Sequence, residues 1–165
     1  MERLKEVPDA LGRELAAEVV RRFGRVRLLV SGTSMVPAVL PGDLISVERA
    51  GIGGISPGEI VVFAREGRLV THRVVDRAGS PGVAHLVTCG DRTRRNDAPI
   101  LPAELLGRVT FIERGHRPVP PRRWLRRPER MLCRLLRFSD RATSVYLRLA
   151  ARRRALADEG AECRA

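Results

Sequence analysis

The sequence is almost without lysine, since Lys5 is the only one and arginine supplies the other positive charges. A catalytic lysine in the body of the chain is therefore excluded. The three cysteines are widely spaced and form no Cys-x-x-Cys pair, which favours neither a disulfide framework nor a zinc site. No run approaches the roughly 18 apolar residues of a membrane span, and charges interrupt the N-terminal segment too often for a cleavable signal. We expect a cytoplasmic chain that touches a membrane at most peripherally and needs no metal ion or cofactor.

Positive charge is concentrated in the last third of the chain. From Arg114 onward there are 15 arginines and five acidic residues, which accounts for +10 of the net charge of +12. Such a segment is typical of contact with an anionic partner. Nucleic acid is disfavoured, because aromatic residues make up only 4% of the sequence and no helix-turn-helix pattern is present. Acidic lipid remains as a partner, and the alternative is that the apolar faces of this segment pack on the rest of the protein.

What is present is the composition of one folded domain, with 44% hydrophobic residues in 165. Leu11, Leu15, Val19 and Phe23 lie four apart with Ala16 and Val20 beside them, which predicts an amphipathic helix that ends at Gly24. Short β-rich runs and turn signals then alternate. The expected strands are Val26–Val30, Leu44–Glu48, Ile60–Ala64, Leu69–Asp76, His85–Thr88 and Arg108–Ile112. Because no long helix separates them, antiparallel pairing in a meander or partly closed barrel is favoured over a parallel sheet.

Helical spacing returns after the proline-rich stretch at 118–121. Pro128 suits a first helical position, and Ser139 or Asp140 suits the cap of a second helix. We therefore predict a mainly β fold with an N-terminal helix (1–24), a catalytic β domain (25–114), and a linker with two basic amphipathic helices (115–165).

The segment after the first expected strand contains a candidate nucleophile. Ser34 follows an apolar strand in a run of small residues, where little covers its hydroxyl. Such a serine is usually only a turn residue. It becomes reactive when a base takes its proton during attack, so the sequence must also supply that base.

His72 is the best candidate for the base among the three histidines. Alternation along its strand puts Val70, His72 and Val74 on one half-buried face. A core histidine without catalytic role would show the same pattern, but partial burial also favours the neutral form that a base needs. His85 and His116 lie near predicted loops.

A carboxylate normally orients such a histidine and stabilises its protonated form. Asp91 and Asp97 both lie in the polar loop that follows the strand His85–Thr88. A solvated loop with local charge pairing is the alternative interpretation.

Five segments in order carry a resemblance to a known family. They are Ser34-Met35-Val36-Pro37 with Gly42-Asp43, the strand Pro57 to Phe63, Thr71-His72-Arg73-Val74, Gly90-Asp91 with Asp97, and Gly107-Arg108-Val109. Together they resemble type I signal peptidases and their soluble relatives, in the archaeal and endoplasmic-reticulum branch where histidine replaces lysine. The resemblance spans about 30–109 and implies the family's mostly β catalytic fold.

The resemblance also implies roles for particular residues. Ser34 would be the nucleophile, His72 the general base and Asp97 its orienting acid, with Asp91 as a supporting or alternative carboxylate. The expected function is a serine endopeptidase that cleaves a leader or signal segment from a precursor peptide or protein, in a form without a membrane anchor. The alternative is a catalytically silent module of the same fold that holds an anionic partner through its basic tail.

Overall fold

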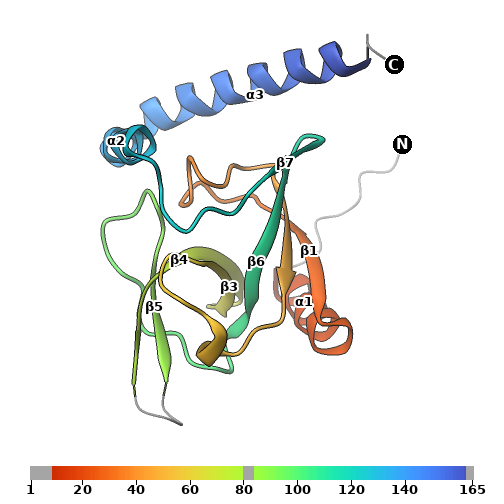
Figure 1. The fold of residues 1–165 in the computed structure, drawn as a ribbon, viewed down its shortest axis with the longest axis vertical. Helices are drawn as coiled ribbons and strands as arrows, with labels where there is room; N and C mark the ends of the chain where they lie inside the picture. Colours follow the sequence, from red (N-terminus) through yellow and green to blue (C-terminus); the bar gives the residue numbers. More distant parts are fainter. Residues whose placement is uncertain (1–8, 80–83, 163–165) are drawn as a thin grey trace.

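The computed structural model describes residues 9–79 and 84–162 (Figure 1). Helix α1 (Asp9–Phe23) precedes the strands, and helices α2 (Arg127–Leu136) and α3 (Asp140–Glu162) follow them. The strands are β1 (Arg25–Leu29), β2 (Leu44–Glu48), β3 (Ile60–Arg65), β4 (Arg68–Ala78), β5 (His85–Cys89), β6 (Leu105–Arg114) and β7 (Arg117–Val119), with a 3-10 turn η1 (Ile52–Gly54) after β2. A mainly β chain with one N-terminal and two C-terminal helices is thus confirmed.

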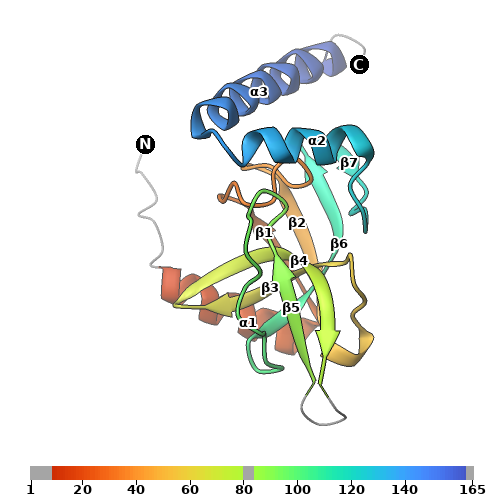
Figure 2. The same ribbon diagram turned by 90° about the vertical axis from the view of Figure 1, so that its left-hand side faces the viewer.

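The strands form one antiparallel sheet in the order β1-β2-β6-β3-β4-β5, and β7 pairs with β6. The register shifts in three of the ladders, between Ser46 and Val47, between Val62 and Phe63, and between Val74 and Asp76. Bulges of this kind bend a strand and increase its twist. The sheet is accordingly coiled, and β3 and β4 curve strongly (Figures 1 and 2).

Both faces of the curved sheet are packed. Along β3, Ile60 and Val62 join a core cluster on one face, whereas Val61 and Phe63 join a second cluster on the other. This alternation follows from the two-residue period of a strand. The first cluster is closed by α1 and the second by η1 and neighbouring loop residues. All four of these β3 residues are buried, which explains the continuous apolar run in the sequence.

Helix α1 is present, and only part of its predicted apolar face is buried. Leu15 and Phe23 are 62% and 68% exposed, whereas Ala16 and Val20 are buried against the sheet. The small alanine allows the helix to lie close to the strands, and this contact selects the face. The side chain of Leu11 lies outside the described residues.

The expected strands are found with most bounds shifted by one or two residues, and there are two larger differences. β6 begins at Leu105 rather than at residue 108, and β7 was not predicted. β7 has only three residues, and one of them is Pro118. Proline interrupts a ladder except at an edge, which is where this strand lies.

Helices α2 and α3 lie at one end of the sheet, where they contact each other and run at a steep angle to one another (Figures 1 and 2). Leu136 packs with Val36 and Leu40, and Leu132, Ala142 and Tyr146 pack against this cluster. The C-terminal helices are therefore attached to the segment between β1 and β2. None of the described helices is both long enough and apolar enough to cross a bilayer.

Candidate active site

Ser34 lies in the irregular segment that joins β1 to β2. Met35 and Val39 point into the core of the sheet, while Val36 and Leu40 are buried under the C-terminal helices. Both sides of the turn are thus covered by apolar contacts. Ser34 is half-buried and held by these neighbours although it lies outside any helix or strand.

A buried carboxylate closes the same turn. The Leu40 N–H donates to Asp43 Oδ2 at 2.7 Å, and Arg114 Nη2 donates to the same oxygen at 2.7 Å. Asp43 is fully buried, and a buried carboxylate requires such donors. The Gly42-Asp43 pair of the sequence therefore fixes the end of the turn. The peptide bond between Val36 and Pro37 is cis.

His72 lies on β4, opposite Val61 of β3. The imidazole is 7% exposed, and its ring makes an edge contact with Phe63 at 6.1 Å between ring centroids. His72 Nε2 lies 3.0 Å from Ser34 Oγ. Strand β4 thus presents the predicted histidine to the predicted serine.

Asp97 completes a row of three side chains. Its Oδ2 lies 2.6 Å from His72 Nδ1, and the Thr88 hydroxyl donates to the same oxygen at 2.6 Å. The Asp97 N–H also donates to the Thr88 carbonyl at 2.8 Å. The carboxylate is therefore tied to β5 by both its backbone and its side chain.

The three side chains have the geometry of a nucleophile, a base and an orienting acid. When His72 Nδ1 donates its hydrogen to Asp97, Nε2 carries the free lone pair that can accept the hydroxyl hydrogen of Ser34. Both heavy-atom distances lie within hydrogen-bond reach. The arrangement can deprotonate the serine and stabilise the imidazolium that results.

Asp91 occupies a different place. It is 8% exposed and accepts two hydrogen bonds from Arg73, at 2.7 Å from both Nε and Nη2. Arg73 Nη1 also donates to the carbonyls of Gly58 and of residues 122 and 123. Of the two carboxylates left open by the sequence, Asp97 bonds to His72 and Asp91 holds the loop to the neighbouring segments.

Two further residues of this loop act on the position of Ser34. The Arg92 N–H donates to the Ser34 carbonyl at 2.8 Å, and its guanidinium reaches Thr33 Oγ1 at 3.2 Å and Thr143 Oγ1 at 3.0 Å. A Cβ on Gly90 would lie 3.0 Å from both His72 Nε2 and the Ser34 carbonyl oxygen. Neither role was predicted from the sequence, in which the Gly90-Asp91 pair is the only signal of them.

A cavity of about 260 Å³ opens beside the serine. Its walls come from β1, from β4 and from the serine segment, and they are mostly apolar. The residues around it are Leu28, Leu29, Val30, Ser31, Gly32, Ser34, Met35, Ile45, Leu69, Val70 and Thr71. An apolar side chain of a bound molecule can occupy this space next to the hydroxyl.

The other titratable residues do not join this row. His85 begins β5 and is half-buried, and His116 is exposed between β6 and β7. Across residues 9–79 and 84–162, no group of three or more histidine, cysteine or acidic side chains is arranged to hold a metal ion. Burial raises the pKa of the Cys133 thiol to about 11, so this thiol is protonated at neutral pH.

No protein-family model matches the sequence, and no curated protein matches it either. The geometry of the three side chains is therefore the basis for assigning a function.

Proposed function

We propose that this chain is a serine endopeptidase that removes a leader or signal segment from a precursor peptide or protein. The observation that carries the proposal is the pair of hydrogen bonds that links Ser34 to His72 and His72 to Asp97, at 3.0 Å and 2.6 Å. The resemblance of the surrounding segments to signal peptidases gives the substrate class. Asp97 is the orienting acid in this proposal, and Asp91 supports the loop.

The reaction proceeds through an acyl-enzyme. Ser34 Oγ attacks the carbonyl carbon of the scissile peptide bond while His72 Nε2 takes the hydroxyl proton. When the tetrahedral intermediate collapses, the carbon–nitrogen bond breaks and His72 returns the proton to the departing amine. A water molecule then attacks the ester, with His72 again taking and returning a proton. Asp97 keeps the imidazole in the productive tautomer and stabilises its charged form.

The oxyanion of each tetrahedral intermediate needs a hydrogen-bond donor. In the described part of the chain, no backbone carbonyl accepts from the Ser34 N–H. This N–H is adjacent to the attacking oxygen and remains available. A donor of this kind contributes about 3 kcal/mol of transition-state stabilisation.

Two strand edges border the apolar cavity and favour an extended substrate. In the described residues β1 pairs only with β2, and residues 68–72 of β4 pair only with β3. Each strand therefore has an edge without a ladder partner. A substrate segment that adds to such an edge gains main-chain hydrogen bonds, and it places alternate side chains toward the cavity. We infer that a small or medium apolar residue precedes the cleaved bond.

Labelling with a fluorophosphonate tests the proposal, because this reagent reacts with an activated serine. We expect wild-type protein to be labelled, and we expect labelling to be lost in Ser34→Ala and strongly reduced in His72→Ala. Ser144→Ala is the matched control, since its hydroxyl lies on α3 and donates to the Asp140 carbonyl. Should wild type label no better than Ser34→Ala, the silent-module alternative would replace the peptidase.

A mixture of peptides with varied sequences tests the substrate class. Mass spectrometry of the products should show cleavage after small or medium apolar residues in wild type, and no cleavage with Ser34→Ala. Cleavage after charged residues would contradict the role assigned to the apolar cavity.

A further inference from the structure

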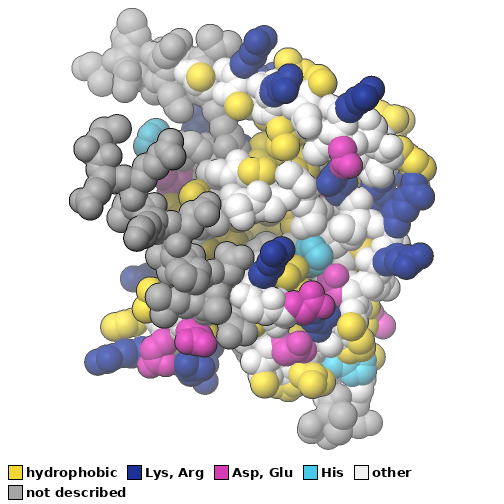
Figure 3. All heavy atoms as spheres, turned by 180° about the vertical axis from the view of Figure 1, so that it is seen from behind, with side chains coloured by type: hydrophobic (Ala, Val, Ile, Leu, Met, Phe, Trp, Pro, Cys, Tyr) yellow, Lys and Arg dark blue, Asp and Glu magenta, His cyan; other side chains and the backbone are white. Residues whose placement is uncertain are grey.

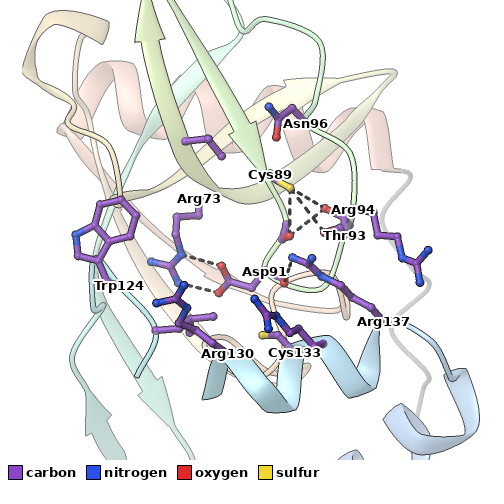
Figure 4. Close-up of a pocket in the computed structure, with 14 residues that line it drawn as sticks. Arg73, Cys89, Asp91, Thr93, Arg94, Asn96, Trp124, Arg130, Cys133 and Arg137 are labelled. Carbon is purple, nitrogen blue, oxygen red and sulfur yellow. Dashed lines mark hydrogen bonds and ion pairs between the residues drawn. The ribbon is translucent and has the colours of Figure 1, made fainter. Parts of the chain in front are cut away.

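A second cavity, of about 680 Å³, lies between the loop after β5 and helix α2 (Figure 4). It is on the other side of β4 from the imidazole, because Arg73 and Val75 line it and alternate with His72 along the strand. Trp124 stands at one end of the cavity and Arg137 at the other (Figure 4). Nothing in the proposed peptidase mechanism uses this space.

The cavity is strongly basic. Five arginines line it, at positions 73, 94, 130, 134 and 137, against the single carboxylate of Asp91. Arg73 is neutralised by that carboxylate through two hydrogen bonds. Arg94 stacks on the Phe138 ring at 4.1 Å, and Arg137 donates to the Asp91 carbonyl at 3.1 Å. Among the described residues, no carboxylate forms an ion pair with any of the other four arginines. Four positive charges therefore surround the cavity without a carboxylate partner.

An exposed apolar ridge adjoins these arginines. Met131, Leu135 and Phe138 are 68%, 68% and 75% exposed. At 100° per residue Met131 and Leu135 lie about 40° apart on α2, and Phe138 follows just after the helix ends at Leu136. Arg130 and Arg134 occupy the adjoining sector of the helix, and together with the C-cap residue Arg137 they line the cavity. Hydrophobic and arginine side chains lie side by side over the C-terminal helices in the space-filling view (Figure 3).

We propose that the arginine-lined cavity and the ridge of Met131, Leu135 and Phe138 form a docking site for an anionic lipid surface. Phosphate headgroups enter the basic cavity, and the ridge enters the interface between headgroups and acyl chains. Trp124, 64% exposed at the cavity, has the amphipathic ring that favours this interface.

The combination of charge and apolar exposure selects the lipid over other anions. An acidic polypeptide or a nucleic acid would match the arginines but would leave the ridge in water. A free phosphate would fill only a small part of the cavity. Only a surface with phosphates outside and hydrocarbon beneath satisfies both features of α2 at once.

Docking through α2 would hold the proposed active site near the membrane. Leu136 of α2 packs against Val36, two residues from Ser34. Gly90 lines the basic cavity, and its Cβ position is 3.0 Å from His72 Nε2. The docking proposal does not depend on the peptidase proposal, because it predicts binding even when Ser34 is replaced.

Vesicle binding tests the docking site, with Trp124 as the probe because it is the only tryptophan. We expect sedimentation with vesicles of equal parts phosphatidylcholine and phosphatidylglycerol, a blue shift of tryptophan fluorescence, and neither effect with phosphatidylcholine alone. Binding should weaken as salt is raised. The double variant R130Q/R134Q should bind roughly thirtyfold more weakly, since each arginine near such a surface contributes about 1 kcal/mol.

The double variant R22Q/R25Q is the matched control, because it removes the same charge from exposed positions at the far end of the sheet. It should bind within about threefold of wild type. M131S/L135S tests the ridge and should weaken binding at least about tenfold. Circular dichroism checks that each variant is folded.

Several results would overturn the proposal. Wild-type protein could bind neutral vesicles as well as anionic ones, or it could bind neither. R22Q/R25Q could also lose as much affinity for anionic vesicles as R130Q/R134Q does. Arginine-dependent binding of inorganic phosphate without vesicle binding would assign the cavity to a free anion. Arginine-dependent binding of poly-glutamate or an oligonucleotide without vesicle binding would assign it to an acidic polymer.

Discussion

Replacement of Gly90 by alanine should disturb the hydrogen-bonded row of Ser34, His72 and Asp97 without replacing any of the three. The added Cβ would lie 3.0 Å from His72 Nε2, from the Ser34 carbonyl oxygen and from Thr93 Cγ2. Each contact is about 0.4 Å short of the 3.4 Å at which ordinary van der Waals contact begins. The φ angle of Gly90 lies outside the left-handed region, so the effect is one of space and not of backbone strain.

The neighbours of Gly90 can relieve the crowding only by moving against their own restraints. The Ser34 carbonyl accepts from the Arg92 N–H at 2.8 Å, and the imidazole of His72 is held by Asp97 at 2.6 Å. We therefore expect the distance between Nε2 and Oγ to increase by a few tenths of an ångström. Since a misplacement of about 1 Å costs roughly a hundredfold in rate, the loss here should be about tenfold. Overpacking should also lower the free energy of unfolding by about 1–3 kcal/mol.

Fluorophosphonate labelling rates and thermal unfolding measure the two effects of Gly90→Ala separately. The matched control is Gly51→Ala, because no atom lies within 4 Å of its added Cβ and its φ is −82°. This control should label at the wild-type rate. The reasoning fails if Gly90→Ala labels as fast as wild type and unfolds at the same temperature.

Further outcomes are expected for changes at Asp97, Asp91, Gly107 and Cys133. Asp97→Asn should slow fluorophosphonate labelling by roughly 10³–10⁴-fold, because the amide favours the wrong imidazole tautomer. Asp91→Asn should instead lower the free energy of unfolding by about 3 kcal/mol, since it leaves the buried Arg73 guanidinium without its carboxylate. Labelling rates and urea unfolding distinguish these two results. Gly107→Ala should lower the free energy of unfolding by about 3 kcal/mol or more, because its Cβ would overlap the Glu48 carbonyl oxygen across the sheet, and a urea midpoint equal to that of wild type would contradict this. Burial raises the pKa of Cys133 from 9.0 to about 11. The thiol should therefore leave the free energy of unfolding unchanged below pH 9.0 and lower it as the pH rises toward about 11, because the unfolded state loses the proton first. Cys133→Ala should remove this contribution to the pH dependence of stability.

The sequence was sufficient for the three helices and for six of the seven strands, and it singled out Ser34 and His72. The period of two in β4 indicated that His72 shares a face with valines, and the small residues around Ser34 indicated an accessible hydroxyl. These are local properties that the sequence carries directly. Strand β3 was also predicted, because its continuous apolar run is a local property of the sequence.

Properties that depend on packing between distant segments were not available from the sequence. Asp91 and Asp97 lie in the same loop, and the way this loop folds back decides which one meets the imidazole, because Asp97 is bonded to Thr88 of β5 and Asp91 to Arg73 of β4. Similarly, the periodicity of α1 gave its apolar positions, but the packing against the sheet decides that Ala16 and Val20 are buried while Leu15 stays exposed. Large apolar residues are a guide to burial only when the partner surface can accommodate them.

The packing of α2 on the Ser34 segment has a consequence for folding during synthesis. Val36 and Leu40 gain their cover from Leu136, which lies about a hundred residues later in the chain. Chains emerge from the ribosome N-terminus first, at roughly 5–20 residues per second. For several seconds the strands can assemble while the turn that carries Ser34 still lacks its outer cover. This turn should therefore become rigid late in synthesis, after α2 has been made.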